Sequence, residues 1–228
     1  MEPKLIAERE AGSGILNQRA ALHDARVLVV ALVGPPGAGK TAIIEATARQ
    51  LRDRARVAAI VVNPAAARDA DRISRYCRQV QAVNTAAPHA DAIWPALHQI
   101  DLAQTDILFI ETVGGTSGAP DLGQDVTVTV LGVTGGDDKA AEYARLLTES
   151  QLLILSKAEL QRHVIFDRGA FRADVRRINP LTELIEVSAF ENTGLAGWLA
   201  WLDRRRNEKD PGYLPPTSPP PPAEWYFG

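Results

Sequence analysis

The stretch from residue 34 to 41 reads GPPGAGKT and limits what this chain can fold into more than any other part of the sequence. It matches the pattern G-x-x-x-x-G-K-[ST], follows the apolar run 27–33, and opens a segment with helical spacing. In such a strand–loop–helix unit, backbone N–H groups and the N-terminus of the helix cradle phosphate groups. We therefore expect this loop, called the phosphate loop below, to bind a nucleoside triphosphate.

The phosphate loop carries side chains for the phosphates and for a magnesium ion. Lys40 is expected to reach the β- and γ-phosphates, and the Thr41 hydroxyl to bind Mg²⁺. The alternative is a Gly/Pro turn that binds nothing, and the full pattern in its proper context argues against it. The predicted nucleotide-binding residues here are Gly34, Pro36, Gly37, Ala38, Gly39, Lys40, Thr41 and Ala42.

Composition indicates one globular α/β domain with tails, since 46% of the 228 residues are hydrophobic. The 25 basic and 28 acidic residues give a net charge of −3, so we expect no nucleic-acid partner. The apolar runs are too short to cross a bilayer and no secretory signal is evident, so we expect a cytoplasmic protein without a membrane partner. The single Cys77 excludes an internal disulfide and a multi-cysteine metal site.

Predicted strands and helices alternate along the chain. This pattern predicts the α/β fold of P-loop NTPases, a mainly parallel sheet with helices on both faces and the site at the strand C-terminal ends. The predicted strands cover 27–33, 57–62, 81–83, 106–111, 126–133, 152–155 and 183–187. The predicted helices cover 41–54, 69–79, 91–100, 138–149, 171–178 and 194–206.

Glu111 ends a predicted buried strand and precedes Thr112-Val113-Gly114. A carboxylate at this point can hold Mg²⁺ directly or through water, and Gly114 allows a backbone N–H to approach the γ-phosphate. We therefore predict Lys40, Glu111 and Gly114 as catalytic residues, with Thr41 and Glu111 at the Mg²⁺. The alternative is an exposed carboxylate at a strand end.

The segment Ser156-Lys157-Ala158-Glu159 stands where GTPases carry Asn-Lys-x-Asp after a buried strand. Glu159 is expected to accept hydrogen bonds from guanine N1 and N2, and the stem of Lys157 to cover the base. Ser188 and Ala189 follow the last strand, where backbone N–H groups can read the guanine oxygen. These two imperfect motifs favour GTP and GDP over adenine nucleotides, with Ser156, Lys157, Glu159, Ser188 and Ala189 at the base. Alone, Ser-Lys-Ala-Glu would be an ordinary helix start.

With these motifs in order, the chain resembles the hydrogenase nickel-incorporation GTPase family (HypB) and, more distantly, the urease accessory GTPases. The resemblance implies a nucleotide-dependent homodimer in which slow GTP hydrolysis gates nickel delivery to an apo-metalloenzyme, helped by a metallochaperone partner. It extends from about residue 27 to 203. The matching segments are 34–41, 69–73, 83–85, 89–92, 109–114, 121–123, 133–139 and 187–189.

The chain departs from the family pattern at positions close to metal and phosphate. Asn63 stands in place of a switch aspartate, so it cannot act as a base or neutralise Mg²⁺ charge. Pro88 replaces the cysteine of a metal-binding Cys-His pair, which leaves His89, and residues 115–120 hold no cysteine. His89 alone is expected to bind Ni²⁺ or Zn²⁺ weakly, because thiolates and multiple ligands supply most of the affinity.

Two functions follow as alternatives, and a third is less favoured. The first is a slow GTPase that assists nickel insertion into a hydrogenase-type enzyme. The second is a hydrolysis-impaired nucleotide-binding scaffold or regulator of a maturation complex, motivated by Asn63 and the missing cysteines. A small-molecule kinase or ATPase would need a lid, and no arginine-rich lid segment is evident.

We divide the chain into an N-terminal extension (1–24), a P-loop GTPase domain (25–207) and a Pro-rich C-terminal tail (208–228). The tail is dense in proline between 211 and 222, so an extended, polyproline-like conformation is expected. Its aromatic cluster Trp225-Tyr226-Phe227 either packs on this chain or a second copy, or docks on a partner.

Overall fold

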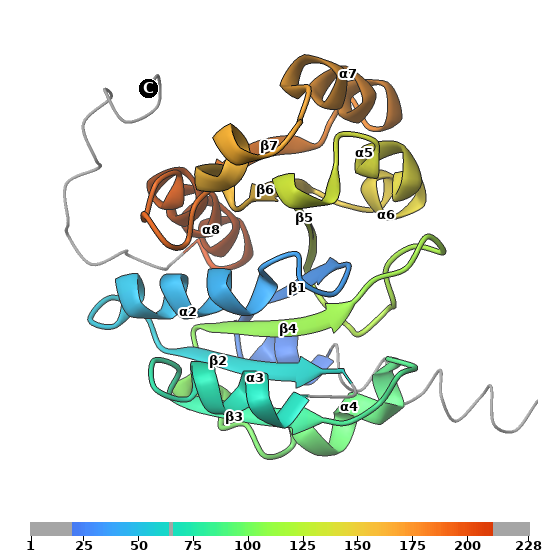
Figure 1. The fold of residues 1–228 in the computed structure, drawn as a ribbon. Coiled ribbons are helices and arrows are strands. Elements are labelled where there is room, and N and C mark those ends of the chain that lie inside the picture. Colours follow the sequence, from blue (N-terminus) through green and yellow to red (C-terminus); the bar gives the residue numbers. More distant parts are fainter. Residues whose placement is uncertain (1–19, 64–65, 212–228) are drawn as a thin grey trace, which may run out of the picture.

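A computed structural model describes residues 20–63 and 66–211 of the chain. One sheet of seven parallel strands forms its centre, in the order β3-β2-β4-β1-β5-β6-β7 (Figure 1). The strands are β1 (Leu28–Gly34), β2 (Val57–Val62), β3 (Gln79–Val83), β4 (Ile107–Val113), β5 (Val126–Gly132), β6 (Leu152–Ser156) and β7 (Glu183–Val187). The α/β fold expected from the alternating pattern is confirmed.

Helices connect the strands and cover both faces of the sheet. The α-helices are α2 (Lys40–Leu51), α3 (Ala66–Ile73), α4 (Ala90–Leu97), α5 (Lys139–Glu142), α6 (Ala144–Thr148), α7 (Arg168–Ile178) and α8 (Leu195–Lys209). The described residues also form the short 3-10 helices η1 (Leu102–Gln104), η2 (Val133–Gly135) and η3 (Ala158–His163). The described chain begins with a helical stretch at 20–24.

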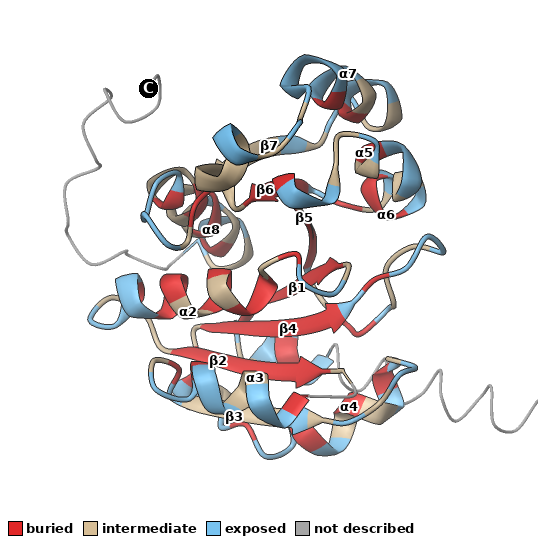
Figure 2. Cartoon of the chain, in the orientation of Figure 1, coloured by how far each residue is buried: buried red, intermediate tan, exposed pale blue. Residues whose placement is uncertain are grey.

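β1 and β2 are buried along their whole length, as Figure 2 shows in red. Every residue of β1 and of β2 is buried, which matches their continuous apolar sequences LVVALVG and VAAIVV. Continuous apolar runs are typical of parallel strands with helices on both sides. Alternate residues of β4 belong to different cores: Phe109 contacts the side that carries α2 and α8, and Ile110 the side that carries α4.

Strand register brings the two main phosphate-site motifs together. In the parallel pair of β1 and β4, Leu32 lies opposite Glu111 and Gly34 opposite Val113. The phosphate loop leaves the C-terminal end of β1, so Glu111 lies at the same sheet edge as the loop. The order of the strands therefore assembles this site from segments about 70 residues apart.

Tryptophans anchor α8 to α2. Trp198 and Trp201 are fully buried and stacked, with ring centroids 5.5 Å apart. The Trp198 Nε1–H donates to Thr47 Oγ1 at 2.8 Å, so a buried polar group is satisfied across the two helices. Leu202 of α8 is buried on the same face, while Leu199 is only partly buried.

Some predicted bounds differ from the observed ones. The helix expected at 138–149 is divided at Tyr143 into α5 and α6, because Tyr143 leaves helical geometry with φ −101° and ψ 28°. The helix expected at 69–79 begins earlier and ends at Ile73, after which the chain turns toward β3. Residues 1–19 of the N-terminal extension and 212–228 of the tail, with its aromatic cluster, lie outside the described residues. Within the described part of the chain, no helix is long and apolar enough to cross a membrane.

Candidate functional site

Glycine backbone conformations shape the phosphate loop. Gly37 and Gly39 have φ angles of 74° and 91°, a left-handed region that side chains disfavour. α2 starts at Lys40, directly after this turn, so its unpaired N–H groups face the loop. Gly34 is needed for a different reason: a Cβ there would lie 2.2 Å from the carbonyl oxygen of Val130 in β5.

A cavity of about 480 Å³ opens beside the loop and is called the nucleotide cavity below. It brings together the loop, the end of β4 and the start of α3, three segments far apart in the sequence. Of the predicted loop residues, Gly34 and Ala38 do not line it. The lining residues are Pro36, Gly37, Gly39, Lys40, Thr41, Ala42, Asn63, Asp69, Arg72, Glu111, Thr112 and Val113.

Thr41 and Glu111 meet in the wall of the nucleotide cavity. Thr41 Oγ1 donates to Glu111 Oε1 at 2.7 Å, and Glu111 is only 4% exposed. Burial raises the pKa of the Glu111 carboxyl, although the Thr41 hydrogen bond and the charge of Lys40 oppose this effect. Glu111 Oε2 is buried and has no hydrogen-bond partner among the described residues. A buried hydroxyl and carboxylate with an unsatisfied oxygen are hard-oxygen ligands of the kind Mg²⁺ prefers, so these residues fit that ion.

Lys40 lies folded against its own loop. Its ammonium donates to the carbonyl oxygens of Gly34 and Pro35, both at 2.9 Å. Burial lowers the pKa of Lys40, while the negative charges of Glu111 and Asp69 oppose that shift. In this position the Lys40 ammonium interacts with the carboxylates of Glu111 and Asp69 in the cavity lining.

Asp69 is a site residue that the sequence analysis did not single out. Its carboxylate Oδ2 accepts a hydrogen bond from Asn63 Nδ2 at 3.3 Å, and both residues line the nucleotide cavity. Asp69 also interacts electrostatically with Lys40 and Glu111. The matching segment 69–73 contained the signal, but without the fold its first residue could not be placed beside Asn63.

Gly114 is bonded to the start of the phosphate loop. Its N–H donates to the Gly34 carbonyl oxygen at 3.1 Å, and it does not line the nucleotide cavity. A Cβ at this position would lie 2.3 Å from Val33 Cγ1, so the close approach requires glycine. Contact between this N–H and a γ-phosphate would require the bond to Gly34 to open, and it stays a prediction.

Ser156 connects the two predicted nucleotide motifs. Its hydroxyl is buried and lies within hydrogen-bond reach of the Ala38 carbonyl oxygen in the phosphate loop and of Leu131 O, the latter at 3.3 Å. The side chain therefore lies against the phosphate loop rather than in an open pocket. Lys157 follows with a left-handed φ of 57°, which turns the chain sharply into η3.

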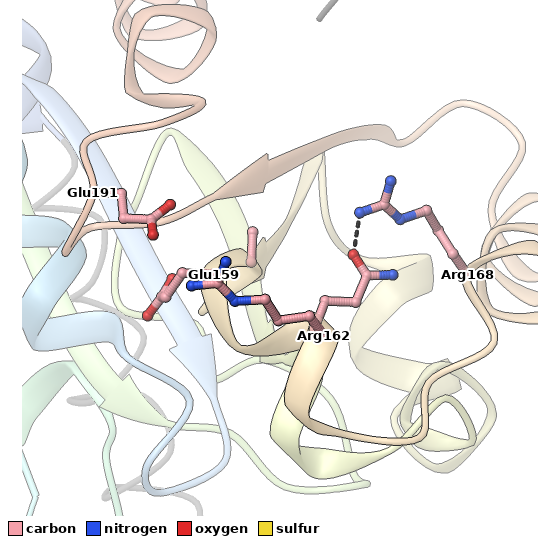
Figure 3. A pocket seen from close by; sticks show the side chains of 6 residues that line it. Glu159, Arg162, Arg168 and Glu191 are labelled. Atoms are coloured by element: carbon pink, nitrogen blue, oxygen red, sulfur yellow. Dashed lines mark hydrogen bonds between the residues drawn. The ribbon is translucent and has the colours of Figure 1, made fainter.

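A second hollow, of about 630 Å³, lies beside Glu159 and is called the base hollow below. Figure 3 shows Arg162 extending toward Glu159, with Glu191 on the same side as Glu159 and Arg168 on the other. Glu159 Oε2 is buried and has no hydrogen-bond partner among the described residues. The base hollow is larger than the nucleotide cavity, but no residue of the phosphate loop lines it. That the two hollows hold the phosphates and the base of one nucleotide stays a prediction.

Ser188 and Ala189 follow β7 in a tight turn. Ser188 is buried; its N–H donates to Thr193 O at 3.0 Å and its Oγ accepts from the Glu191 N–H at 2.9 Å. These bonds stabilise the turn that carries Glu191 to the base hollow. Ala189 packs against the main hydrophobic core.

Comparison with known proteins gives the family. The model of the CobW/HypB/UreG nucleotide-binding domain matches residues 28–186. The chain belongs to the CobW/HypB/UreG family. Hydrogenase maturation factor HypB of Azotobacter vinelandii is 36% identical over 196 residues, which are 84% of this chain and 65% of that protein. The HypB-like resemblance is therefore confirmed, and the chain spans slightly less than two thirds of that relative's length.

Solved structures of HypB share the fold of this CobW/HypB/UreG member. HypB from Archaeoglobus fulgidus matches with a TM-score of 0.78 at 26% identity, over 87% of this chain and all of that one. HypB from Helicobacter pylori, solved in complex with nickel, matches with a TM-score of 0.79 at 22% identity, over 92% and 99%. The match to the Helicobacter pylori protein, at 22% identity, supports a shared fold only.

His89 is exposed at the start of α4, away from any cluster of ligands. Its Nδ1 lies 2.8 Å from the Ala87 carbonyl oxygen. Within 20–63 and 66–211, no group of three or more His, Cys, Asp and Glu side chains could hold a metal ion. A transition-metal role of His89 stays a prediction of weak binding.

Proposed function

We propose that this CobW/HypB/UreG member is a GTPase that assists the maturation of a hydrogenase-type metalloenzyme. The family consists of GTPases, and the 36% identical relative is a hydrogenase maturation factor. The observation that carries the proposal is the Thr41–Glu111 pair at 2.7 Å in the wall of a cavity formed by a complete phosphate loop. This is the arrangement that holds a nucleoside triphosphate together with its metal ion.

In this proposal the phosphates and Mg²⁺ occupy the nucleotide cavity. Bound Mg²⁺ would neutralise charge on the β- and γ-phosphate oxygens. Thr41 and Glu111 would hold it, and Lys40 would exchange its bonds to Gly34 and Pro35 for bonds to phosphate. The paired Asn63 and Asp69 would orient water at the open side of the cavity. Because Asn63 carries no charge, hydrolysis is expected to be slow.

Guanine is the base that the site favours. Glu159 presents a buried, unsatisfied carboxylate oxygen, which suits a ligand edge with two N–H donors such as guanine N1 and N2. Adenine presents an acceptor at N1, so the same oxygen would be left without a donor. Leaving a buried charged acceptor unpaired costs about 1–3 kcal/mol or more, which favours GTP over ATP.

A second candidate is a nucleotide-binding scaffold without useful hydrolysis. The observation that favours it is the hydrogen bond from Asn63 to Asp69, which ties up a carboxylate that could otherwise activate water. In that case nucleotide binding would regulate assembly of a maturation complex, and a partner would supply the chemistry.

Single-turnover hydrolysis of GTP and ATP by the full chain, beside Lys40→Ala, distinguishes these functions. We expect slow GTP hydrolysis in the presence of Mg²⁺, little ATP hydrolysis, and none by the variant. GTP binding without hydrolysis above the Lys40→Ala background would favour the scaffold. Preference for ATP would contradict the assignment of the base.

Nickel handling is proposed to depend on partners: a metallochaperone, an apo-enzyme client, and a second copy in a nucleotide-dependent homodimer. The described residues offer His89 alone where the family pattern has a Cys-His pair. Titration with Ni²⁺ and Zn²⁺ should show only weak binding, which His89→Ala weakens further. Submicromolar binding that this substitution abolishes would contradict the proposal.

A further inference from the structure

A hollow lined by arginines lies at the sheet edge opposite the phosphate loop. It has a volume of about 400 Å³ and lies at the loop between α2 and β2, beside the residues that precede β3 and β4. Four arginines line it, Arg52, Arg54, Arg56 and Arg78, together with Asp53 and Asp106. We call it the arginine hollow; the nucleotide chemistry uses none of its residues.

The negative charge of Asp106, one of the two acidic residues in the lining, is neutralised by neighbouring arginines. Asp106 pairs with Arg56 through Oδ1 at 2.7 Å, and accepts two further bonds from Arg56 at Oδ2, at 2.7 and 3.1 Å. The buried Arg206 of α8 lies 3.5 Å from the same carboxylate. Partial burial opposes ionisation of Asp106, but the bonds from Arg56 and the charge of Arg206 outweigh it and hold its pKa below the usual value. Two cations thus face one anion here.

The other arginines keep unused donors. Arg54 makes a 3.4 Å ion pair with Asp203, but its Nε–H is buried without an acceptor among the described residues. The side chains of Arg52 and Arg78 are exposed and form no ion pair or hydrogen bond within 20–63 and 66–211. Asp53 is the one acidic side chain in the described lining without a cation partner. The hollow is therefore positive on a chain of net charge −3.

An adjoining hollow of about 240 Å³ extends this surface toward apolar side chains. It shares Arg52, Asp53, Ala55 and Arg78 with the arginine hollow, and it adds the buried Val57 and the half-buried Tyr76. The surface thus passes from charged donors to an aromatic and aliphatic wall. A small anion would fill one end only, whereas an extended peptide with carboxylates beside an apolar residue would use both.

We propose that the arginine hollow and its apolar extension form a docking surface for an acidic segment of a partner protein. Its carboxylates would pair with Arg52 and Arg78 and accept from Arg54 Nε, since arginine recognises carboxylates through paired N–H donors. An apolar side chain of the segment would pack on Tyr76 and Val57. Charge complementarity of this kind sets partner choice and association rate.

The docking surface and the nucleotide site lie at opposite ends of α2, which begins at Lys40 and ends at Leu51 (Figure 1). A helix of this length separates its ends by about 18 Å. A partner on the arginine hollow would therefore leave the nucleotide cavity open. For the same reason, substitutions in the hollow test the docking proposal separately from the GTPase proposal.

The test is fluorescence anisotropy of the full chain with a labelled peptide of six glutamates and one tyrosine, at low ionic strength. We expect the Arg52→Glu/Arg78→Glu variant to lose about tenfold or more in affinity, and added salt to weaken binding. Arg176→Glu, a reversal at an exposed arginine on α7, should bind like the wild type. GTP affinity should be the same in all three, which also shows that the variants are folded.

Three results would overturn the proposal. Equal peptide binding by the wild type and the double variant would show that these arginines do not bind carboxylates. Equal binding of a peptide with glutamines in place of the glutamates would show that charge is not recognised. Stronger binding of pyrophosphate or a single-stranded oligonucleotide through the same arginines would assign the hollow to another class of ligand.

Discussion

At position 156 a buried serine hydroxyl lies between two backbone carbonyl oxygens, Ala38 in the phosphate loop and Leu131 in β5. The motif predicted Ser156 among the nucleotide-binding residues. Its short side chain reaches the phosphate loop, while Glu159 lines the base hollow. Contact of Ser156 with a nucleotide stays a prediction. A single hydroxyl can thus couple the phosphate loop to the motif that is predicted to bind the base.

Replacing Asn63 with the aspartate of the family pattern tests how the nucleotide cavity tolerates an added negative charge. In Asn63→Asp the amide donor to Asp69 is lost and two carboxylates face each other across about the same 3.3 Å. We expect the free energy of unfolding without ligand to fall by about 1–2 kcal/mol, and Mg²⁺–GTP to bind more tightly because the ion relieves the repulsion.

Urea unfolding and calorimetric titration of Asn63→Asp measure these two changes. The double variant Asn63→Asp/Asp69→Asn restores one carboxylate and one amide, so it should regain the stability of the wild type. Unchanged stability in the single variant would mean that the two side chains are not coupled.

The buried carboxyl of Glu111 predicts a pH dependence of metal-assisted binding. Because burial raises its pKa above the ordinary value of 4.5, Glu111 takes up a proton at a higher pH than an exposed glutamate. A protonated carboxyl cannot bind Mg²⁺, so the Mg²⁺-dependent gain in GTP affinity should shrink as pH falls toward the raised pKa. Titrations at several pH values, with and without Mg²⁺, measure this gain.

Glu111→Gln provides the control for that titration. The amide does not titrate, so the gain from Mg²⁺ should be small and should change with pH only as far as the nucleotide phosphates do. If the variant followed the same pH curve as the wild type, Glu111 would not be the titrating group.

At the scale of elements, the strands were predictable and several helices were not. The apolar runs of β1, β2 and β4 indicated strands buried on both faces, and each was found within two residues of its expected bounds. The helix break at Tyr143 could not be predicted, because no glycine or proline marks it in the sequence. The conformation of a single tyrosine depends on packing, which periodicity does not describe.

The candidate site was predictable where a motif fixes local geometry, and less so where it depends on the fold. The phosphate loop and Glu111 needed only the strand–loop–helix order and a carboxylate at a strand end. The position of Asp69 beside Asn63 needed the approach of α3 to the cavity, which depends on tertiary packing. The bond of Gly114 to Gly34 likewise depends on the register of β1 and β4.

The contact between α2 and α8 predicts a measurable loss of stability. In Thr47→Val the side-chain volume is nearly kept, but the buried Trp198 Nε1–H loses its acceptor at 2.8 Å. An unsatisfied buried donor costs about 1–3 kcal/mol, and urea unfolding should show a loss of that size. Thr47→Ser retains the hydroxyl and should keep that bond. A loss in Thr47→Ser equal to that in Thr47→Val would point to the methyl group instead.

At the scale of the whole molecule, Cys77 reports on opening of the core. It is buried in the cluster that unites α2, α3 and α8, and burial raises the pKa of its thiol to about 12. Because the thiolate is the reactive form, a thiol reagent at neutral pH should react only when the fold opens. GTP and Mg²⁺ at about 100 times the Kd should slow this labelling about a hundredfold.

Labelling of Cys77 that nucleotide does not slow would mean that the region opens locally, without disturbing the nucleotide site. The Lys40→Ala variant should show the unprotected rate at every GTP concentration, which separates protection by binding from nonspecific effects.

The account as a whole depends on a phosphate cavity and a base hollow acting on one GTP molecule. Glu159→Gln tests this most directly. The glutamine amide can donate a hydrogen bond to the second carbonyl of xanthine, whereas it offers the N2 donors of guanine one acceptor oxygen fewer than the carboxylate does. Calorimetric titration with GTP and XTP should show that the substitution weakens GTP and strengthens XTP, each by about tenfold or more. Unchanged GTP affinity in Glu159→Gln, with no gain for XTP, would contradict the account.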